Sequence, residues 1–100
     1  MLIGFVDFDT TATDRPAALA HLEAECADVR AMPGNLAFRV YASRDDDRGI
    51  SIVHEWADEA SFDGYLGSAS FAQSGVVLRP LMTGEPVSRR FRAEAVATPA

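Results

Sequence analysis

The stretch NLAFRVYASRDDDRGISIVHEWA, residues 35–57, determines the fold because two apolar segments flank a short charged loop. Residues 35–43 and 49–57 are rich in the β-branched and aromatic residues that favour strands. The intervening residues RDDDR are typical of an exposed turn. The sequence therefore predicts an antiparallel β-hairpin in the middle of the chain.

The register of this hairpin can be predicted from its cross-strand pairs. One register places Phe38 opposite Trp56 and Arg39 opposite Glu55, which gives an aromatic pair and a pair of opposite charges. Each such pair stabilises a sheet by roughly 0.2–1 kcal/mol. A shift by one residue would place Phe38 against Glu55, so we expect the first register, with a loop of odd length and a bulge.

This register divides the hairpin into two faces. The apolar face is expected to pack under helices and carries Leu36, Phe38, Val40, Ile52, His54 and Trp56. The other face mixes apolar and charged groups, and it carries Ala37, Arg39, Tyr41, Val53 and Glu55. Such a face suits a contact between subunits better than open water. We therefore predict Arg39, Tyr41 and Glu55 at a dimer interface.

The segments before the hairpin add a strand and a helix. Residues 2–9, LIGFVDFD, have strand composition. Residues 15–31 carry an apolar stripe at helical spacing, behind a candidate N-cap at Asp14. Cys26 falls on this stripe and is expected to be a buried, inert thiol. His21 lies off the stripe and is expected to be a solvated surface residue.

The segments after the hairpin complete an α+β pattern. Asp58 is expected to cap a short helix, residues 71–78 form a second helical piece, and residues 87–96 form the last strand. The order strand, helix, strand, strand, helix, strand is that of the ferredoxin-like βαββαβ fold with a four-stranded antiparallel sheet. We expect one domain over residues 1–96 and a disordered tail at residues 97–100.

Helices cover one face of such a sheet and leave the other bare. Two copies packed sheet against sheet would cover both bare faces and form a dimeric α+β barrel. A chain of 100 residues buries a modest core, which dimerisation often supplements. We therefore expect a homodimer.

Composition and charge exclude several classes of protein. A net charge of −6 disfavours nucleic acid as a partner, because affinity for a polyanion comes mostly from neutralising phosphates. The basic cluster Arg89, Arg90 and Arg92 lies in the last strand, where arginines commonly prevent sheet-to-sheet aggregation. The chain lacks the roughly 18 consecutive apolar residues that a membrane span needs. We expect a cytoplasmic protein with no membrane partner.

A family resemblance rests on residues 33–71, which read PGNLAFRVYASRDDDRGISIVHEWADEASFDGYLGSASF. This segment resembles the antibiotic biosynthesis monooxygenase family of the dimeric α+β barrel superfamily. The matching features are Pro33-Gly34, the Phe38-x-x-Tyr41 spacing, Glu55-x-Trp56, Phe62, Leu66-x-Ser68 and Phe71. The resemblance implies a bacterial protein whose relatives oxidise polycyclic phenols or quinols with molecular oxygen and without a metal, flavin or haem. It also implies a ligand cavity between the helices and the sheet.

The resemblance directs attention to the aromatic residues of the helix-facing side. The expected catalytic residues are His54, Trp56 and Tyr65, and the expected contacts to a small aromatic substrate are Phe38, Ile52, Phe62 and Phe71. His54 is the best candidate base because the unperturbed pKa of histidine is roughly 6.5. Trp56 matches a tryptophan of the family's site, whereas many relatives have histidine in place of Tyr65. The rings of Trp56 and Tyr65 can stack on a flat ligand, and their N–H and O–H groups can donate hydrogen bonds.

Other interpretations stay open at this stage. Trp56 and His54 are equally consistent with a filled aromatic core, in which case the protein is a purely structural dimer. The same pocket without turnover would make it a small-molecule-binding protein. A related family degrades haem, but the corresponding positions hold Asp7, Tyr65 and Gly75, and glycine cannot ligate iron. We therefore expect no cofactor and no metal.

Overall fold

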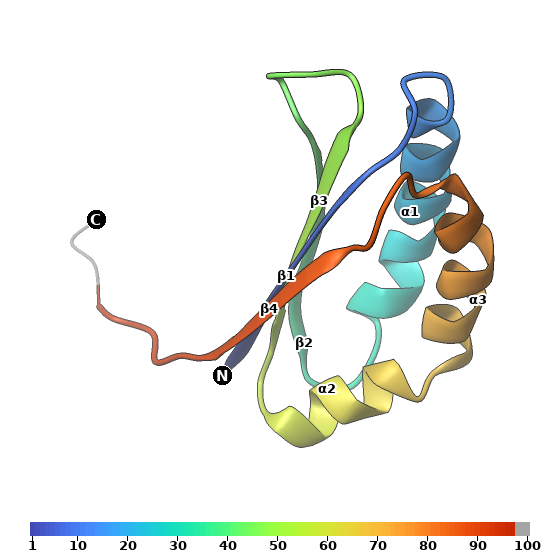
Figure 1. Cartoon of the computed structure of the whole chain (residues 1–100). Coiled ribbons are helices and arrows are strands. Elements are labelled where there is room, and N and C mark those ends of the chain that lie inside the picture. The colour runs from blue at the N-terminus through green and yellow to red at the C-terminus, as the bar shows by residue number, and fades with distance from the viewer. Residues whose placement is uncertain (98–100) are drawn as a thin grey trace.

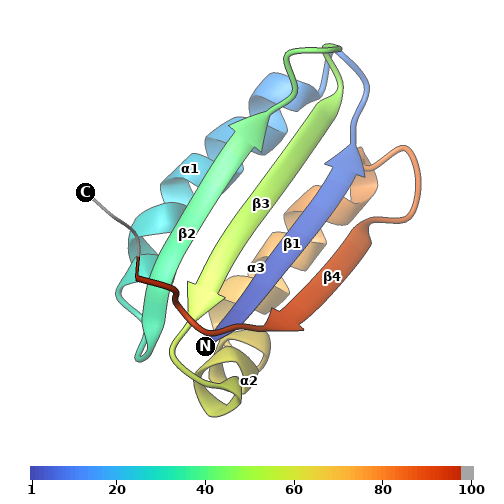
Figure 2. The same ribbon diagram turned by 90° about the vertical axis from the view of Figure 1, so that its left-hand side faces the viewer.

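A four-stranded antiparallel sheet in the order β2-β3-β1-β4 organises the computed structural model, which describes residues 1–97. The elements in chain order are β1 (Leu2–Asp9), α1 (Arg15–Arg30), β2 (Asn35–Ala42), β3 (Gly49–Trp56), α2 (Glu59–Leu66), α3 (Ala69–Leu78), the 3-10 turn η1 (Arg79–Leu81) and β4 (Val87–Arg92). The helices lie on one side of the sheet (Figure 1), and the other side is bare in the view of Figure 2. The predicted ferredoxin-like α+β fold is confirmed.

Local sequence signals account for the helix ends with one exception. The Asp58 side chain accepts a hydrogen bond from the Ser61 N–H at 2.8 Å and caps α2 as predicted. The Ser68 hydroxyl caps α3 in the same way through the Phe71 N–H at 3.1 Å, so α3 begins at Ala69, before the predicted start. Asp14 occupies the N-cap position of α1, but its side chain makes no capping bond.

The last strand is shorter than predicted. It ends at Arg92 because its pairing with β1 ends there, where Leu2 faces Arg92 at the start of the chain. Only Ala97 of the predicted tail belongs to the described residues, and positions 98–100 lie outside them.

The predicted register of the hairpin is wrong by two residues. Phe38 faces His54 and not Trp56, and Arg39 faces Val53 and not Glu55. The loop accounts for the difference: the Asp46 carboxylate accepts hydrogen bonds from the N–H groups of Arg48 and Gly49 at 2.9 and 2.8 Å. This turn joins β2 and β3 in the observed register, in which the two predicted side-chain pairs do not form.

The two-residue shift leaves most of the face assignment intact because side chains alternate with a period of two. Phe38, His54 and Trp56 still point toward the helices and are buried. Leu36 is the exception, since a register irregularity between Asn35 and Ala37 turns it outward and leaves it 57% exposed. The bulge therefore lies at the start of β2 and not at the loop.

Phe38 and Leu36 should respond differently to truncation. Phe38→Ala is expected to lower the free energy of unfolding by about 3–5 kcal/mol, because it removes a fully buried ring. Leu36→Ala is expected to change it by less than about 0.5 kcal/mol, since the side chain lies in solvent. Urea unfolding followed by tryptophan fluorescence measures both. Equal losses from the two variants would contradict the bulge.

Candidate functional site

A cavity of about 460 Å³ lies between the helix-facing side of β1, β3 and β4 and the helices α2 and α3. Its volume falls within the roughly 300–1,000 Å³ that is typical of small-molecule sites. Of the seven predicted catalytic and substrate-binding residues, five line the cavity: Ile52, His54, Phe62, Tyr65 and Phe71. These five side chains therefore border a cavity and do not fill the space between the sheet and the helices.

Phe38 and Trp56 are not part of the cavity wall. Their exposed fractions are 1% and 0%, and they pack behind His54. The ring of His54 lies 5.9 Å from that of Phe38 and 6.2 Å from that of Trp56, measured between centroids. The structure thus places these two predicted site residues in the core, one layer behind the ligand space.

Trp56 determines which nitrogen of His54 carries the proton. The indole Nε1–H donates a hydrogen bond to His54 Nδ1 at 2.8 Å. Indole nitrogen can only donate, so Nδ1 must be the acceptor and the proton of the neutral ring must reside on Nε2. His54 therefore offers an N–H donor, and not a lone pair, to the space in front of it.

The electrostatic environment keeps His54 neutral. Burial, together with the nearby positive charge of Arg90, lowers the pKa of His54 from 6.5 to about 4. The imidazole is therefore uncharged at neutral pH and a weak base. The predicted role of His54 as the base disagrees with both its tautomer and its pKa.

Gly4 makes room for the imidazole. It faces His54 across the β1–β3 pairing, and a Cβ added at Gly4 would lie 2.4 Å from His54 Nε2. Any side chain at this position would force the ring away from its place. Glycine in the middle of a strand indicates such a close approach, and Gly4 lies within the strand segment LIGFVDFD, residues 2–9.

Tyr65 forms the boundary between the core and the cavity. Its ring stacks on Trp56 with centroids 5.1 Å apart and contacts Phe71, at 5.2 Å, on the cavity side. Burial, and to a smaller extent the negative charge of Glu25, raise the pKa of Tyr65 well above its ordinary value of 10.0. The phenol stays protonated and can donate a hydrogen bond.

Arginines supply the charge of the cavity wall. Arg79 and Arg90 line it, and none of the lining residues in the described part of the chain is acidic. The Arg89 guanidinium lies over Phe5 and 4.0 Å from Asp7, on the bare side of the sheet. The Arg90 guanidinium lies 4.8 Å from the centroid of Phe62. In a chain of net charge −6, this wall favours a ligand with negative charge. The sequence favours edge protection over ligand binding for the last-strand arginines, but Arg90 lines the cavity. Arg92 pairs with Glu59 instead.

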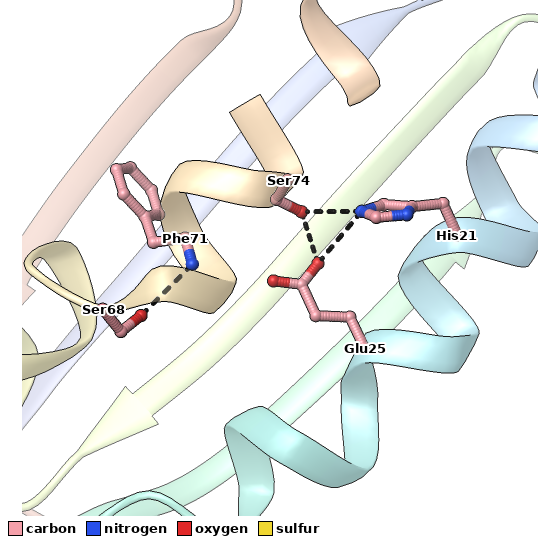
Figure 3. A network of polar contacts seen from close by, with 5 residues as sticks. All are labelled: His21, Glu25, Ser68, Phe71 and Ser74. Carbon is pink, nitrogen blue, oxygen red and sulfur yellow. Dashed lines mark hydrogen bonds and ion pairs between the residues drawn. The ribbon is translucent and has the colours of Figure 1, made fainter. Parts of the chain in front are cut away.

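Three polar side chains meet between α1 and α3 (Figure 3). The Ser74 hydroxyl donates to Glu25 Oε2, and His21 Nε2 lies 3.2 Å from Ser74 Oγ and 3.5 Å from Glu25 Oε2. The prediction of a solvated His21 is wrong, because its side chain is 22% exposed and has two polar partners. Glu25 is buried on the apolar stripe, where it stands three residues after Leu22.

The predicted interface residues Arg39, Tyr41 and Glu55 lie on the bare side of the sheet, away from the cavity. Because of the shifted register, Arg39 and Glu55 are not opposite each other. Tyr41 is 48% exposed. Asp7, one of the haem-site positions considered, also lies on this side and accepts a hydrogen bond from the Ser51 hydroxyl at 2.5 Å.

Within residues 1–97, no group of three or more His, Cys, Asp or Glu side chains is placed to hold a metal ion. No helix in this range is long and apolar enough to cross a membrane.

Sequence reasoning missed Gly4, the arginines of the wall, and Glu25 with Ser74. Gly4 and Glu25 carried local signals, a glycine inside a strand and a charge on an apolar stripe. Ser74 carried none, because it meets Glu25 across 49 positions of sequence.

Comparison with known proteins gives a family and a fold. The family model described as antibiotic biosynthesis monooxygenase matches residues 2–74. A solved structure of a candidate antibiotic biosynthesis monooxygenase from Deinococcus radiodurans has a TM-score of 0.90 and 16% identity, covering 100% of this chain and 99% of its own. The structure of Rv0793 from Mycobacterium tuberculosis has a TM-score of 0.87 and 18% identity, covering 97% and 98%. A search of curated proteins finds no significant match.

The lowered pKa of His54 predicts a pH dependence of stability. Between about pH 6.5 and pH 4 the unfolded chain binds a proton at this histidine and the folded chain does not, so stability falls as the pH falls through this window. The full effect is about 3 kcal/mol, at 1.36 kcal/mol per pKa unit. Urea unfolding at a series of pH values should show a smaller loss for His54→Gln than for the unmodified protein. Parallel curves would contradict the neutral, buried imidazole.

Proposed function

The chain belongs to the antibiotic biosynthesis monooxygenase family, and we propose that it oxidises a small phenol or quinol with molecular oxygen inside the cavity. The observation that carries the proposal is the cavity itself, walled by aromatic rings with a neutral His54 Nε2–H at its base. The proposal requires no metal, flavin or haem. It commits to a reaction class and not to a particular substrate.

The shape and charge of the wall support a flat, acidic aromatic substrate. Phe62, Tyr65 and Phe71 offer ring faces and edges for stacking. Arg79 and Arg90 favour the negative charge that a phenol or quinol acquires on deprotonation. A site of this kind binds the anion of its substrate better than the neutral molecule.

The proposed oxidation begins when the substrate loses a proton. The electron-rich anion then passes an electron to dioxygen, and the two radicals combine at carbon. For an anthrone, the CH₂ group takes one oxygen atom and becomes a carbonyl, and the second oxygen atom leaves with the two hydrogens as water. The protein must stabilise negative charge on the substrate oxygen during these steps.

In the proposal, His54 and Trp56 have different roles in stabilising this negative charge. His54 donates its Nε2–H to the substrate oxygen, and its low pKa keeps the ring neutral, because the ring does not accept a second proton. Trp56 acts through His54, because its Nε1–H fixes the tautomer from behind. Trp56 is therefore a positioning residue, whereas His54 and Tyr65 face the ligand space.

The alternative functions differ in how well the structure supports them. A purely structural dimer would have no cavity. Haem degradation is not proposed, because Asp7 lies on the opposite side of the sheet and Gly75 has no side chain to offer the iron. Binding without turnover uses the same cavity, and the oxygen measurement below distinguishes it from catalysis.

We also propose that the chain forms a homodimer through the bare side of the sheet. This side carries apolar residues that helices do not cover, among them Tyr41, Val87 and Phe91, which are 48%, 57% and 48% exposed. Exposed apolar patches of this kind mark interaction surfaces. A second copy of the same sheet is complementary in size and would bury them.

Oxygen uptake with a panel of anthrones and hydroquinones tests the oxidation. The unmodified protein should consume oxygen with at least one member, and His54→Gln should lower kcat by roughly 10²–10³-fold, the usual cost of one oxyanion donor. Trp56→Phe should lower kcat by a smaller factor, because the imidazole keeps its place but loses its fixed tautomer. Glu55→Gln on the bare side serves as a control and should leave kcat unchanged.

Tight binding of panel members without any oxygen uptake would contradict the oxidation and favour the binding function. Uptake that His54→Gln leaves intact would contradict the role of His54.

The dimer is tested by a charge placed on the bare side. Tyr41→Glu should weaken the dimer at least tenfold, a loss of about 1.4 kcal/mol, because the new carboxylate must be desolvated at the interface. Ala27→Glu on the exposed surface of α1 introduces the same charge on the helical side and should have no effect. Sedimentation equilibrium measures both. A monomeric unmodified protein would rule the homodimer out.

A further inference from the structure

We propose that Ser74 relays the hydroxyl proton of the substrate from the cavity to the buried carboxylate of Glu25, with His21 as the residue that positions both. This inference rests on the proposed function, because the oxidation needs a base and His54 does not provide one. The relay would make the buried carboxylate of Glu25 the proton acceptor of the reaction.

Glu25 has an unused acceptor in the interior. Its residue is 7% exposed, and its Oε1 is the only buried side-chain oxygen or nitrogen within residues 1–97 that has no hydrogen-bond partner. Figure 3 shows this oxygen directed away from both His21 and Ser74. Burying a carboxylate in this way is costly unless a proton or a donor arrives. A proton from the substrate would neutralise the carboxylate and remove this cost.

Ser74 connects Glu25 with the ligand space. It lines the cavity from α3 and donates its hydroxyl hydrogen to Glu25 Oε2. An oxygen that donates one hydrogen still has lone pairs with which to accept another. A substrate hydroxyl that donates to Ser74 Oγ would therefore be one hydroxyl group away from the carboxylate.

His21 positions Ser74 and Glu25 from the side of α1. Its Nε2 lies 3.2 Å from Ser74 Oγ and 3.5 Å from Glu25 Oε2. Because Ser74 donates its one hydrogen to Glu25, both of these oxygens are acceptors, and Nε2 must carry a hydrogen. His21 is therefore a donor that holds the pair in place, and Glu25 is the end of the relay.

The proton balance of the relay is simple. The substrate O–H bond, which in an anthrone is that of the enol tautomer, breaks and its proton moves to Ser74 Oγ, while the original Ser74 proton moves to Glu25 Oε2. Glu25 keeps this proton as a neutral carboxylic acid, and His21 Nε2–H remains a donor beside Ser74 Oγ. The substrate keeps the electron pair as an anion, which His54 Nε2–H and the arginines of the wall stabilise. No oxidant takes part in these steps.

Mixing the protein with the anthrone dithranol under nitrogen tests the relay separately from oxidation. The anion of dithranol absorbs at longer wavelength than the neutral molecule, so stopped-flow absorbance follows its formation. The unmodified protein should form the anion on binding. Glu25→Gln and Ser74→Ala should slow its formation by roughly 10²-fold or more, the typical contribution of a positioned base.

Matched controls lie nearby on the same helices. Glu23→Gln removes an exposed carboxylate from α1, and Ser70→Ala removes a hydroxyl of α3 that does not line the cavity. Both should form the anion at the rate of the unmodified protein. If Glu25→Gln fails to fold, as judged by circular dichroism, Ser74→Ala carries the test alone.

The outcomes separate this inference from the proposed function. Anion formation at an unchanged rate in Glu25→Gln or Ser74→Ala overturns the relay, as does a failure of the unmodified protein to form the anion. Anion formation that depends on both residues, followed by no oxygen uptake in air, supports the relay and contradicts the oxidation instead.

Discussion

The hydrogen bond from Trp56 Nε1–H to His54 Nδ1 constrains the whole site. It joins two residues on the same face of β3, and it assigns the imidazole proton to Nε2. Gly4 on the neighbouring strand leaves the space in which the ring lies, and Phe38 closes the other side. The sheet therefore holds a neutral hydrogen-bond donor at the base of the cavity, with an orientation that three strands determine together.

This constraint separates two tasks that a single histidine could otherwise share. A donor to a developing oxyanion should be neutral, rigid and hard to protonate, whereas a proton acceptor needs an anionic or basic group within reach of the substrate. Burial makes His54 such a donor, because it lowers the pKa of the imidazole to about 4. The carboxylate of Glu25 on α1 is the proposed acceptor. His54 lines the cavity from the sheet, and Ser74 connects the cavity with Glu25 from the helices.

The sequence predicts which side of the sheet a residue faces better than it predicts whether the residue reaches the cavity or lies in the core. Alternation along β3 placed Ile52, His54 and Trp56 on the helix-facing side, and a two-residue error of register does not change that assignment. Which of these side chains reaches the cavity depends on where α2 and α3 lie over the sheet, and that is why the sequence leaves open whether Trp56 contacts a ligand or lies in the core. The Asp46 turn joins β2 and β3 in the observed register, in which the side-chain pairs used to predict the register do not form.

The tautomer of His54 tests the account most directly. Nitrogen-15 NMR of the imidazole at neutral pH distinguishes a protonated ring nitrogen from an unprotonated one. The account predicts a neutral ring with the proton on Nε2, and a mixture of both tautomers in Trp56→Phe. A proton on Nδ1, or a charged ring at neutral pH, would contradict it, because His54 would then be free to act as the base.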